Sequence, residues 1–186
     1  MKKYAVWVLL CVFLTGCSGS ADEIQTAMEL RSKLLQSVQC TFDTAIMADY
    51  GDKVHTFTMN CQSDGKGDLT FTVSKPDTIA GISGKLSGEG GELIFDDTAL
   101  HFDLLAEGQF SPISAPWILM RTLRSGYITS ACREVDNIWL SVDDSYEDDP
   151  LSLDIWLNAE GLPEYADILY DGRRILSVAL ENFRIL

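Results

Sequence analysis

Short runs in which every second residue is apolar recur along most of the chain, and they constrain its fold more than any other feature. Leu69, Phe71 and Val73 alternate with polar residues, and Pro76 follows the run. Because successive side chains of a strand point to opposite faces, such a run predicts a strand with one buried face. The same pattern predicts strands over residues 38–48, 53–62, 79–86, 92–95, 99–104, 135–142, 151–157, 165–170 and 174–186.

These strands follow one another through short turns. Asp171-Gly172, between the last two, is typical of a two-residue hairpin. Nine or ten antiparallel strands in succession imply one large sheet, which has to curl strongly to bury its apolar face.

Two segments have helical spacing instead. Ser20-Ala21-Asp22-Glu23 has the spacing of a capping box, and the apolar residues after it predict an amphipathic helix from about residue 21 to 37. A second helix is predicted after Ser114, with Pro116 in its first turn and Gly126 as terminator. It is too apolar for a surface helix, so we expect it to fill the concave side of the sheet with Trp117, Ile118, Leu119, Met120 and Leu123. The fold class predicted is therefore α+β.

The first sixteen residues have the layout of an export signal. Two lysines precede an apolar run over residues 4–14, which is too short to span a bilayer. The following Leu-Thr-Gly-Cys resembles the lipobox of bacterial lipoproteins; the alternative is an ordinary secretory signal with an incidental cysteine. We therefore predict a signal peptide over residues 1–16, a tether over 17–20 lipidated at Cys17, and a single domain over 21–186 at the extracytoplasmic face of a cell membrane.

Acidic residues dominate the charge of the chain. There are 28 acidic against 14 basic residues, and loss of Lys2 and Lys3 with the signal lowers the net charge from −14 to −16. Binding to nucleic acid requires a cationic surface, so DNA and RNA are not expected partners. A calcium site is conceivable in the acidic cluster over residues 143–149, but the spacing lacks the EF-hand pattern and favours a solvated loop.

Three cysteines follow the predicted lipidation site. If residues 38–48 and 53–62 form a hairpin that turns through 49–52, Cys40 faces Cys61, and an extracytoplasmic location permits a disulfide between them. Two buried thiols are the alternative. Cys132 is left unpaired and is expected to be a small buried side chain.

The sequence offers few groups for catalysis. His55 and His101 are the only histidines, and there is neither an HExxH nor a CxxC pattern to hold a metal. No nucleophile elbow or phosphate loop is recognisable, so no cofactor is predicted and binding is favoured over catalysis. An envelope hydrolase stays a third possibility that requires two carboxylates close together in a cleft.

Several stretches resemble the family of lipoprotein-carrier proteins with the LolA and LolB-like fold, including its relatives among the lipoproteins of Gram-positive bacteria. They are residues 71–76, 91–97 with Leu100 and Phe102, 154–157 with 161–163, and 170–176 with Asn182 and Phe183. The resemblance implies an incomplete β-barrel whose helices close its mouth around an apolar cavity for acyl chains. The carriers are soluble in the periplasm, whereas this chain is predicted to be anchored, so the resemblance supports the fold more than lipoprotein transport itself.

Two functional hypotheses follow. The first is a membrane-anchored lipoprotein that binds a lipid or other amphiphile in an apolar cavity and acts in lipid or lipoprotein handling. The residues expected to line the cavity are Phe57, Met59, Phe71, Phe95, Trp117 and Met120. Each of these could instead be an ordinary core residue. The second is an envelope structural or interaction lipoprotein that presents its convex acidic surface to a protein partner, with Trp156 exposed as an anchor or partly buried.

Overall fold

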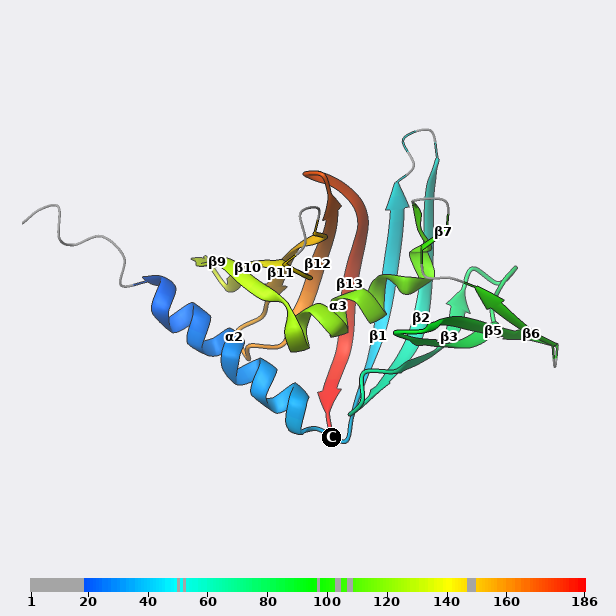
Figure 1. The fold of residues 1–186 in the computed structure, drawn as a ribbon, viewed down its shortest axis with the longest axis horizontal. Coiled ribbons are helices and arrows are strands. Elements are labelled where there is room, and N and C mark those ends of the chain that lie inside the picture. Colours follow the sequence, from blue (N-terminus) through cyan, green and yellow to red (C-terminus); the bar gives the residue numbers. More distant parts are fainter. Residues whose placement is uncertain are drawn as a thin grey trace, which may run out of the picture.

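The structure is a computed structural model that describes residues 19–49, 51, 53–96, 98–102, 105–106, 109–146 and 150–186. Within these residues, eleven strands form one antiparallel sheet in the order β6-β5-β4-β3-β2-β1-β13-β12-β11-β10-β9 (Figure 1). Their bounds are β1 Gln39–Asp49, β2 Val54–Asp64, β3 Leu69–Lys75, β4 Ser83–Ser87, β5 Gly90–Phe95, β6 Thr98–Phe102, β9 Tyr127–Glu134, β10 Asn137–Asp143, β11 Ser152–Leu157, β12 Pro163–Tyr170 and β13 Arg173–Ile185. Two short strands, β7 (Leu105–Ala106) and β8 (Gln109–Phe110), pair separately.

The sheet curls without closing, because β6 and β9 stand at opposite ends of the strand order (Figure 1). Helices α2 (Gly19–Gln36) and α3 (Ala115–Ser125) lie on its concave side, with a 3₁₀ turn, η1 (Pro112–Ser114), before α3. Helix α2 lies by β9, and α3 runs across the middle strands. The predicted curved sheet with an N-terminal and a central helix over its concave side is confirmed.

The core lies between the sheet and the two helices. Side chains alternate between buried and partly exposed along β1, β10 and β11, as the sequence predicted. Ala27, Leu30 and Leu34 form the buried face of α2 and join these strands in one cluster. Among the described helices, none is long and apolar enough to span a membrane.

The ends of some strands differ from prediction. Residues 79–82 form turns, in which Ile79 N donates to Pro76 O and Ile82 N to Ile79 O, so β4 begins later than expected. Strand β9 was not predicted, because it lies at the edge of the sheet and buries only Ala131, which leaves no alternation to read. The turn at Asp171-Gly172 is confirmed: both residues have positive φ angles, of 49° and 68°, between the paired Tyr170 and Arg173.

The predicted register of the first hairpin is wrong by two residues. Asp49 pairs with Val54, so Cys40 lies opposite Ser63 and Cys61 lies opposite Phe42. A shift of two residues leaves each side chain on its original face, so the apolar pattern could not distinguish the two registers. Both cysteines are buried free thiols, and the predicted disulfide between Cys40 and Cys61 is absent.

The other expectation about cysteines also needs correction. Cys132 is exposed, not buried, because it lies on the outer side of the edge strand β9 opposite Trp139. In contrast, burial raises the pKa of the Cys61 thiol, which keeps that cysteine in its unreactive protonated form.

Candidate functional site

Helix α3 is the element that the site is built around. Nine of its eleven residues are buried, which fits the strongly apolar sequence from Trp117 to Leu123. Pro116 occupies its first turn, and the backbone N–H of Gly126 closes it by donating to Thr122 O. The helix therefore fills the concave side of the sheet as predicted.

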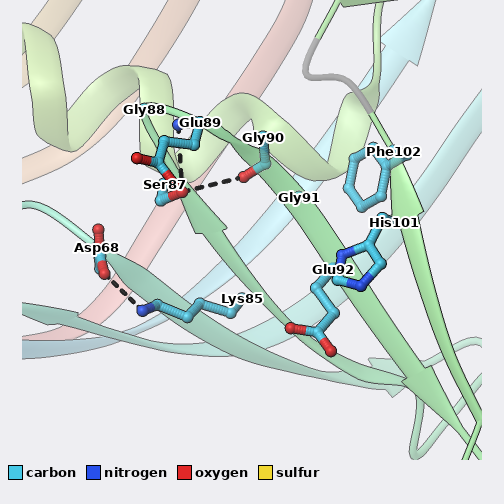
Figure 2. A pocket seen from close by; sticks show the side chains of 10 residues that line it. All are labelled: Asp68, Lys85, Ser87, Gly88, Glu89, Gly90, Gly91, Glu92, His101 and Phe102. Atoms are coloured by element: carbon cyan, nitrogen blue, oxygen red, sulfur yellow. Dashed lines mark hydrogen bonds and ion pairs between the residues drawn. The ribbon is translucent and has the colours of Figure 1, made fainter.

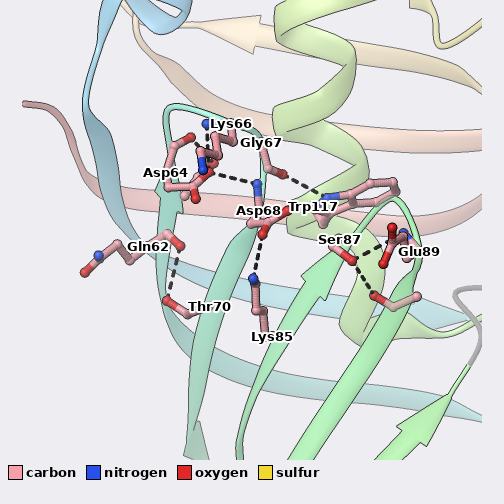
Figure 3. Close-up of polar contacts among 12 residues, drawn as sticks. Gln62, Asp64, Lys66, Gly67, Asp68, Thr70, Lys85, Ser87, Glu89 and Trp117 are labelled. Carbon is pink, nitrogen blue, oxygen red and sulfur yellow. Dashed lines mark hydrogen bonds and ion pairs between the residues drawn. The ribbon is translucent and has the colours of Figure 1, made fainter.

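Two residues of α3 are hydrogen-bonded to the turn between β2 and β3, and Figure 3 shows the contact of Trp117 with Gly67. Trp117 Nε1 donates to Gly67 O over 3.0 Å, and Arg124 Nη2 donates to Asp64 O over 2.7 Å. Asp64 Oδ1 in turn accepts from the backbone N–H groups of Lys66 and Asp68, which orders the turn. Among the described residues, Nε and Nη1 of Arg124 are buried without a hydrogen-bond partner.

The C-terminal end of α3 is tied to α2. Arg31 Nε donates to Leu123 O over 2.9 Å and Arg31 Nη2 to Gly126 O over 2.7 Å, so one guanidinium caps two carbonyls at the end of the helix. Desolvation by burial lowers the pKa of Arg31 from its ordinary value. Helix α3 is thus held from both sides of the sheet.

Five of the six residues predicted to line a cavity lie together in the core. Phe57, Met59, Phe71, Trp117 and Met120 are buried in one apolar cluster under α3. They therefore fill the space between helix and sheet in this structure. Phe95 differs, since its side chain is 62% exposed at the end of β5.

Phe95 belongs to a group of apolar side chains on the concave face of β5 and β6. Leu93 pairs with Leu100, and Gly91 pairs with Phe102, so these side chains share one face with Phe95. Leu100 is 63% exposed, while Leu93 and Phe102 are partly buried against the core. We call Leu93, Phe95, Leu100 and Phe102 the apolar lip.

Two glycines let aromatic rings lie flat along this end of the sheet. A Cβ at Gly84 would come within 2.7 Å of the Phe71 ring and 2.3 Å of Glu92 O, and a Cβ at Gly91 would come within 2.2 Å of the Phe102 ring. The rings of Phe71 and Phe102 therefore occupy the places of missing side chains. Phe71 lies in the core and Phe102 in the lip, so the apolar surface continues from one to the other.

A polar pocket of about 690 Å³ lies at the turn between β4 and β5, and Phe102 is the one lip residue among those that line it (Figure 2). Phe102 and Gly91 form its apolar side, while Ser87, Glu92 and His101 bring polar groups. Lys85 Nζ lies 2.6 Å from Asp68 Oδ2, and the hydrogen bond and negative charge of Asp68 raise the pKa of Lys85. In this register Lys85, Glu92 and His101 lie on the face opposite the lip, and of the pocket residues only Gly91 and Phe102 share the face of the lip.

The outer face of β11 and β12 carries the remaining candidates. Trp156 is partly buried, as the second of the two readings expected: its Nε1 donates to Glu134 Oε2 over 3.0 Å and its ring lies 5.4 Å from that of Tyr165. Asp154 and Asp167 are paired across the strands. Burial and then the charge of Asp167 raise the pKa of Asp154.

The acidic cluster after β10 is described only in part. Asp143 accepts a hydrogen bond from Ser152 Oγ over 2.7 Å. Asp144 accepts one from Leu151 N and forms an ion pair with Arg121. Glu147, Asp148 and Asp149 lie outside the described residues, as do Cys17 and the predicted signal peptide. No group of three or more histidine, cysteine or acidic side chains suited to a metal occurs in the part of the chain that the structure describes.

Sequence analysis missed most of the lip. It placed Leu93, Leu100 and Phe102 on strands but assigned no site to them, because alternation shows which residues share a face and not which end of that face stays uncovered. A usable signal was present in the chain: Leu93-x-Phe95 and Leu100-x-Phe102 lie on neighbouring strands joined by a short turn, and Leu93 opposite Leu100 puts all four side chains on one face.

Several solved structures resemble the chain in fold. A LolA superfamily protein from Nitrosomonas europaea is 9% identical over 86% of this chain and 93% of its own, with a TM-score of 0.48. An outer-membrane lipoprotein-sorting protein domain from Vibrio parahaemolyticus is 7% identical over 89% and 92%, with a TM-score of 0.45. The lipoprotein LppX from Mycobacterium tuberculosis is 6% identical over 87% and 93%, with a TM-score of 0.42. No protein-family model and no curated protein sequence matches the chain.

The fold expected from the resemblance in sequence is confirmed. The open antiparallel sheet with one N-terminal and one central helix is the arrangement that this resemblance implied. A closer relation to the lipoproteins of Gram-positive bacteria stays a prediction.

Proposed function

We propose that the protein is a lipoprotein, anchored through Cys17 at the extracytoplasmic face of a membrane, that binds the hydrocarbon part of a lipid or other amphiphile. Binding rather than catalysis is part of the proposal. The observation that carries it is the apolar lip, where Phe95 and Leu100 stay largely exposed beside Phe102 and the buried Phe71. Exposed apolar patches next to a core are typical of interaction and ligand sites in soluble domains.

Helix α3 determines how deep a hydrocarbon chain can enter. Its buried side chains already occupy the concave side, so a ligand on the lip reaches Phe71 and Met59 only if α3 moves. The ties from Trp117 and Arg124 to the turn after β2 are hydrogen bonds to two carbonyls, which can break and re-form. Each is worth about 1 kcal/mol, or somewhat more for the charged donor. Moving α3 also uncovers its buried apolar side chains, so the ligand's methylenes, at about 0.8 kcal/mol each, have to replace the contacts that those side chains lose.

The test measures binding of a fluorescent fatty acid to the chain from Ser18, secreted without its lipid. Replacing both Phe95 and Leu100 by Ser should weaken binding by about a hundredfold or more, because each lost apolar side chain removes roughly 1.5 kcal/mol or more of burial. The control is Ile94→Ser, which removes an exposed side chain from the same strand as Phe95 but from its opposite face, and it should leave binding unchanged. Equal effects of the control and the lip variant, or no binding at all, would rule out the lip as a ligand site.

The anchor needs its own measurement. Mass spectrometry of the N-terminal peptide of the protein purified from membranes should find Cys17 as the first residue, carrying acyl chains. Cys17→Ala should abolish that modification. A first residue other than Cys17 would refute the anchor and leave the question of ligand binding open to the fluorescence assay.

A second candidate function is capture of a protein partner by the outer face. The observation in its favour is a hollow of about 620 Å³ lined by Trp156, Tyr165, Asp167 and Arg174, which places two aromatic rings beside charged groups. Trp156→Ala should weaken capture of an envelope partner in a cross-linking experiment and leave fatty-acid binding intact. The reverse outcome would favour the lip as the functional surface.

A further inference from the structure

Helix α2 has a second apolar face besides the one it buries. Ala27, Leu30 and Leu34 face the core, whereas Ile24, Met28 and Leu35 are exposed by 40%, 48% and 60%. With 3.6 residues per turn, these three lie within about 40° of one another around the helix. They form a stripe about 16 Å long, which we call the α2 stripe.

The stripe continues past the end of the helix. Val38 is 79% exposed directly after α2, and Leu186 is exposed beside it, with the two backbones joined by a hydrogen bond from Val38 N to Leu186 O. One side of the molecule thus presents a row of large apolar side chains that the described chain leaves uncovered.

The charges around the stripe differ from those of the chain as a whole. Arg31 lies within the stripe's sector, and its guanidinium is engaged with α3. The exposed acids of the helix, Asp22 and Glu29, lie more than about 100° away around its axis. In a chain of net charge −14, this surface is therefore one that anionic headgroups do not repel.

The position of the predicted anchor indicates that a membrane surface covers the α2 stripe. Helix α2 begins at Gly19, two residues after Cys17, and two residues span at most about 7 Å. A lipid on Cys17 therefore holds the start of α2 at the level of the headgroups. We propose that α2 lies flat on the membrane surface with Ile24, Met28 and Leu35 inserted into the interface, so that the domain is oriented by the helix as well as tethered by the lipid.

The experiment uses the full chain, processed and lipidated in cells, with Cys132→Ser as background because Cys40 and Cys61 are buried. A nitroxide label is placed at Met28→Cys or Leu35→Cys, or at the controls Gln25→Cys and Gln36→Cys on the polar side of the same helix. In phosphatidylcholine vesicles, labels at positions 28 and 35 should collide more with oxygen and less with a water-soluble nickel complex than the control labels.

Two results would overturn the proposal. Equal accessibility at all four positions would mean that the lipid holds the domain with α2 free in water. Spin–spin broadening at position 28 that disappears on dilution with unlabelled protein would mean that a second copy covers the stripe. The proposal rests on the anchor at Cys17, whose failure is read separately by mass spectrometry.

Discussion

The two ends of the sheet differ in how far their apolar concave face is buried. From β9 to β13, the closed half, α2 and α3 cover the concave face and side chains such as Leu153 and Ile155 are fully buried. From β3 to β6, the open half, burial declines along the strand order until Leu100 on β6 is mostly exposed. Both halves use the same alternating pattern. The difference therefore lies in what covers the sheet, and that is the property a binding site depends on.

The largest expected effect is the difference in stability lost when one leucine is truncated in each half. Leu153→Ala should lower the free energy of unfolding by about 2–5 kcal/mol, because it leaves a cavity in a closed core. Leu100→Ala, the same change in the open half, should shift it by less than about 0.5 kcal/mol. Urea unfolding followed by circular dichroism measures both. Similar losses for the two variants would mean that Leu100 is covered in solution and that the lip is part of the core.

The next effect locates the boundary of the open half. Gly84→Ala should cost about 1–3 kcal/mol, because the added Cβ meets Glu92 O and the Phe71 ring at distances that require both to shift. Gly88→Ala is the matched control: its Cβ meets nothing within 4 Å, so the change should be close to neutral. Thermal unfolding measures both. Equal stabilities would show that the Phe71 ring is free to move off the strand.

A smaller effect tests how the opening of α3 depends on the hydrogen bonds that hold its two ends. Trp117→Phe removes the donor to Gly67 O, in the turn that leads into the open half, and should cost about 1–2 kcal/mol. Arg31→Met removes the donors to Leu123 O and Gly126 O from the closed half. Hydrogen exchange should speed up in the first turns of α3 for the first variant and in its last turn for the second. Uniform exchange along α3 in both variants would mean that the helix opens as one unit.

The smallest effect concerns two carboxylates on the outer face. The pKa of Asp154, in the closed half, is raised by burial and by Asp167, so its contribution to stability decreases as pH rises above its ordinary value near 3.8. The pKa of Asp43 on β1 is lowered by hydrogen bonds from Asn182 and Asn60, so its contribution is present above that value and is lost on acidification. At pH 7, Asp154→Asn should stabilise and Asp43→Asn destabilise, each by less than about 1 kcal/mol since both groups are largely solvated. Unfolding curves at pH 4 and 7 check the signs, and the same sign for both variants would contradict the assignment.

The sequence predicted the strands, the helix ends and the hairpin turn because these features depend on residues that are close together in the chain. Alternation identified the strand from Leu69, and cap, proline and glycine signals placed α3 between Ser114 and Gly126. The positive φ angles at Asp171 and Gly172 are what that dipeptide predicts. Each of these features depends on neighbours in the chain.

What the sequence did not predict depends on distant partners. A shift of two residues between β1 and β2 keeps both faces intact, so the pairing of Cys40 with Cys61 was a choice between equivalent registers. Phe95 and Phe71 follow the same alternation, yet one is exposed and the other buried, because α3 ends its coverage between them. Likewise, Met28 and Leu35 lie on a face of α2 that the rest of the described chain leaves exposed, and no local pattern shows which apolar face of a helix is buried.

The strand order has a further consequence for where a ligand would travel. Strands β6 and β9 are the two ends of one sheet, and α2 lies beside β9, so the lip is separated from that helix by ten strand intervals, or about 48 Å measured along the curved surface. If the chain is anchored at Cys17 and binds an amphiphile as proposed, a hydrocarbon tail held at β6 would lie at the end of the sheet farthest in strand order from the anchored helix. The β6 end of the sheet would then be free to pass a bound ligand to a partner on the side away from the membrane.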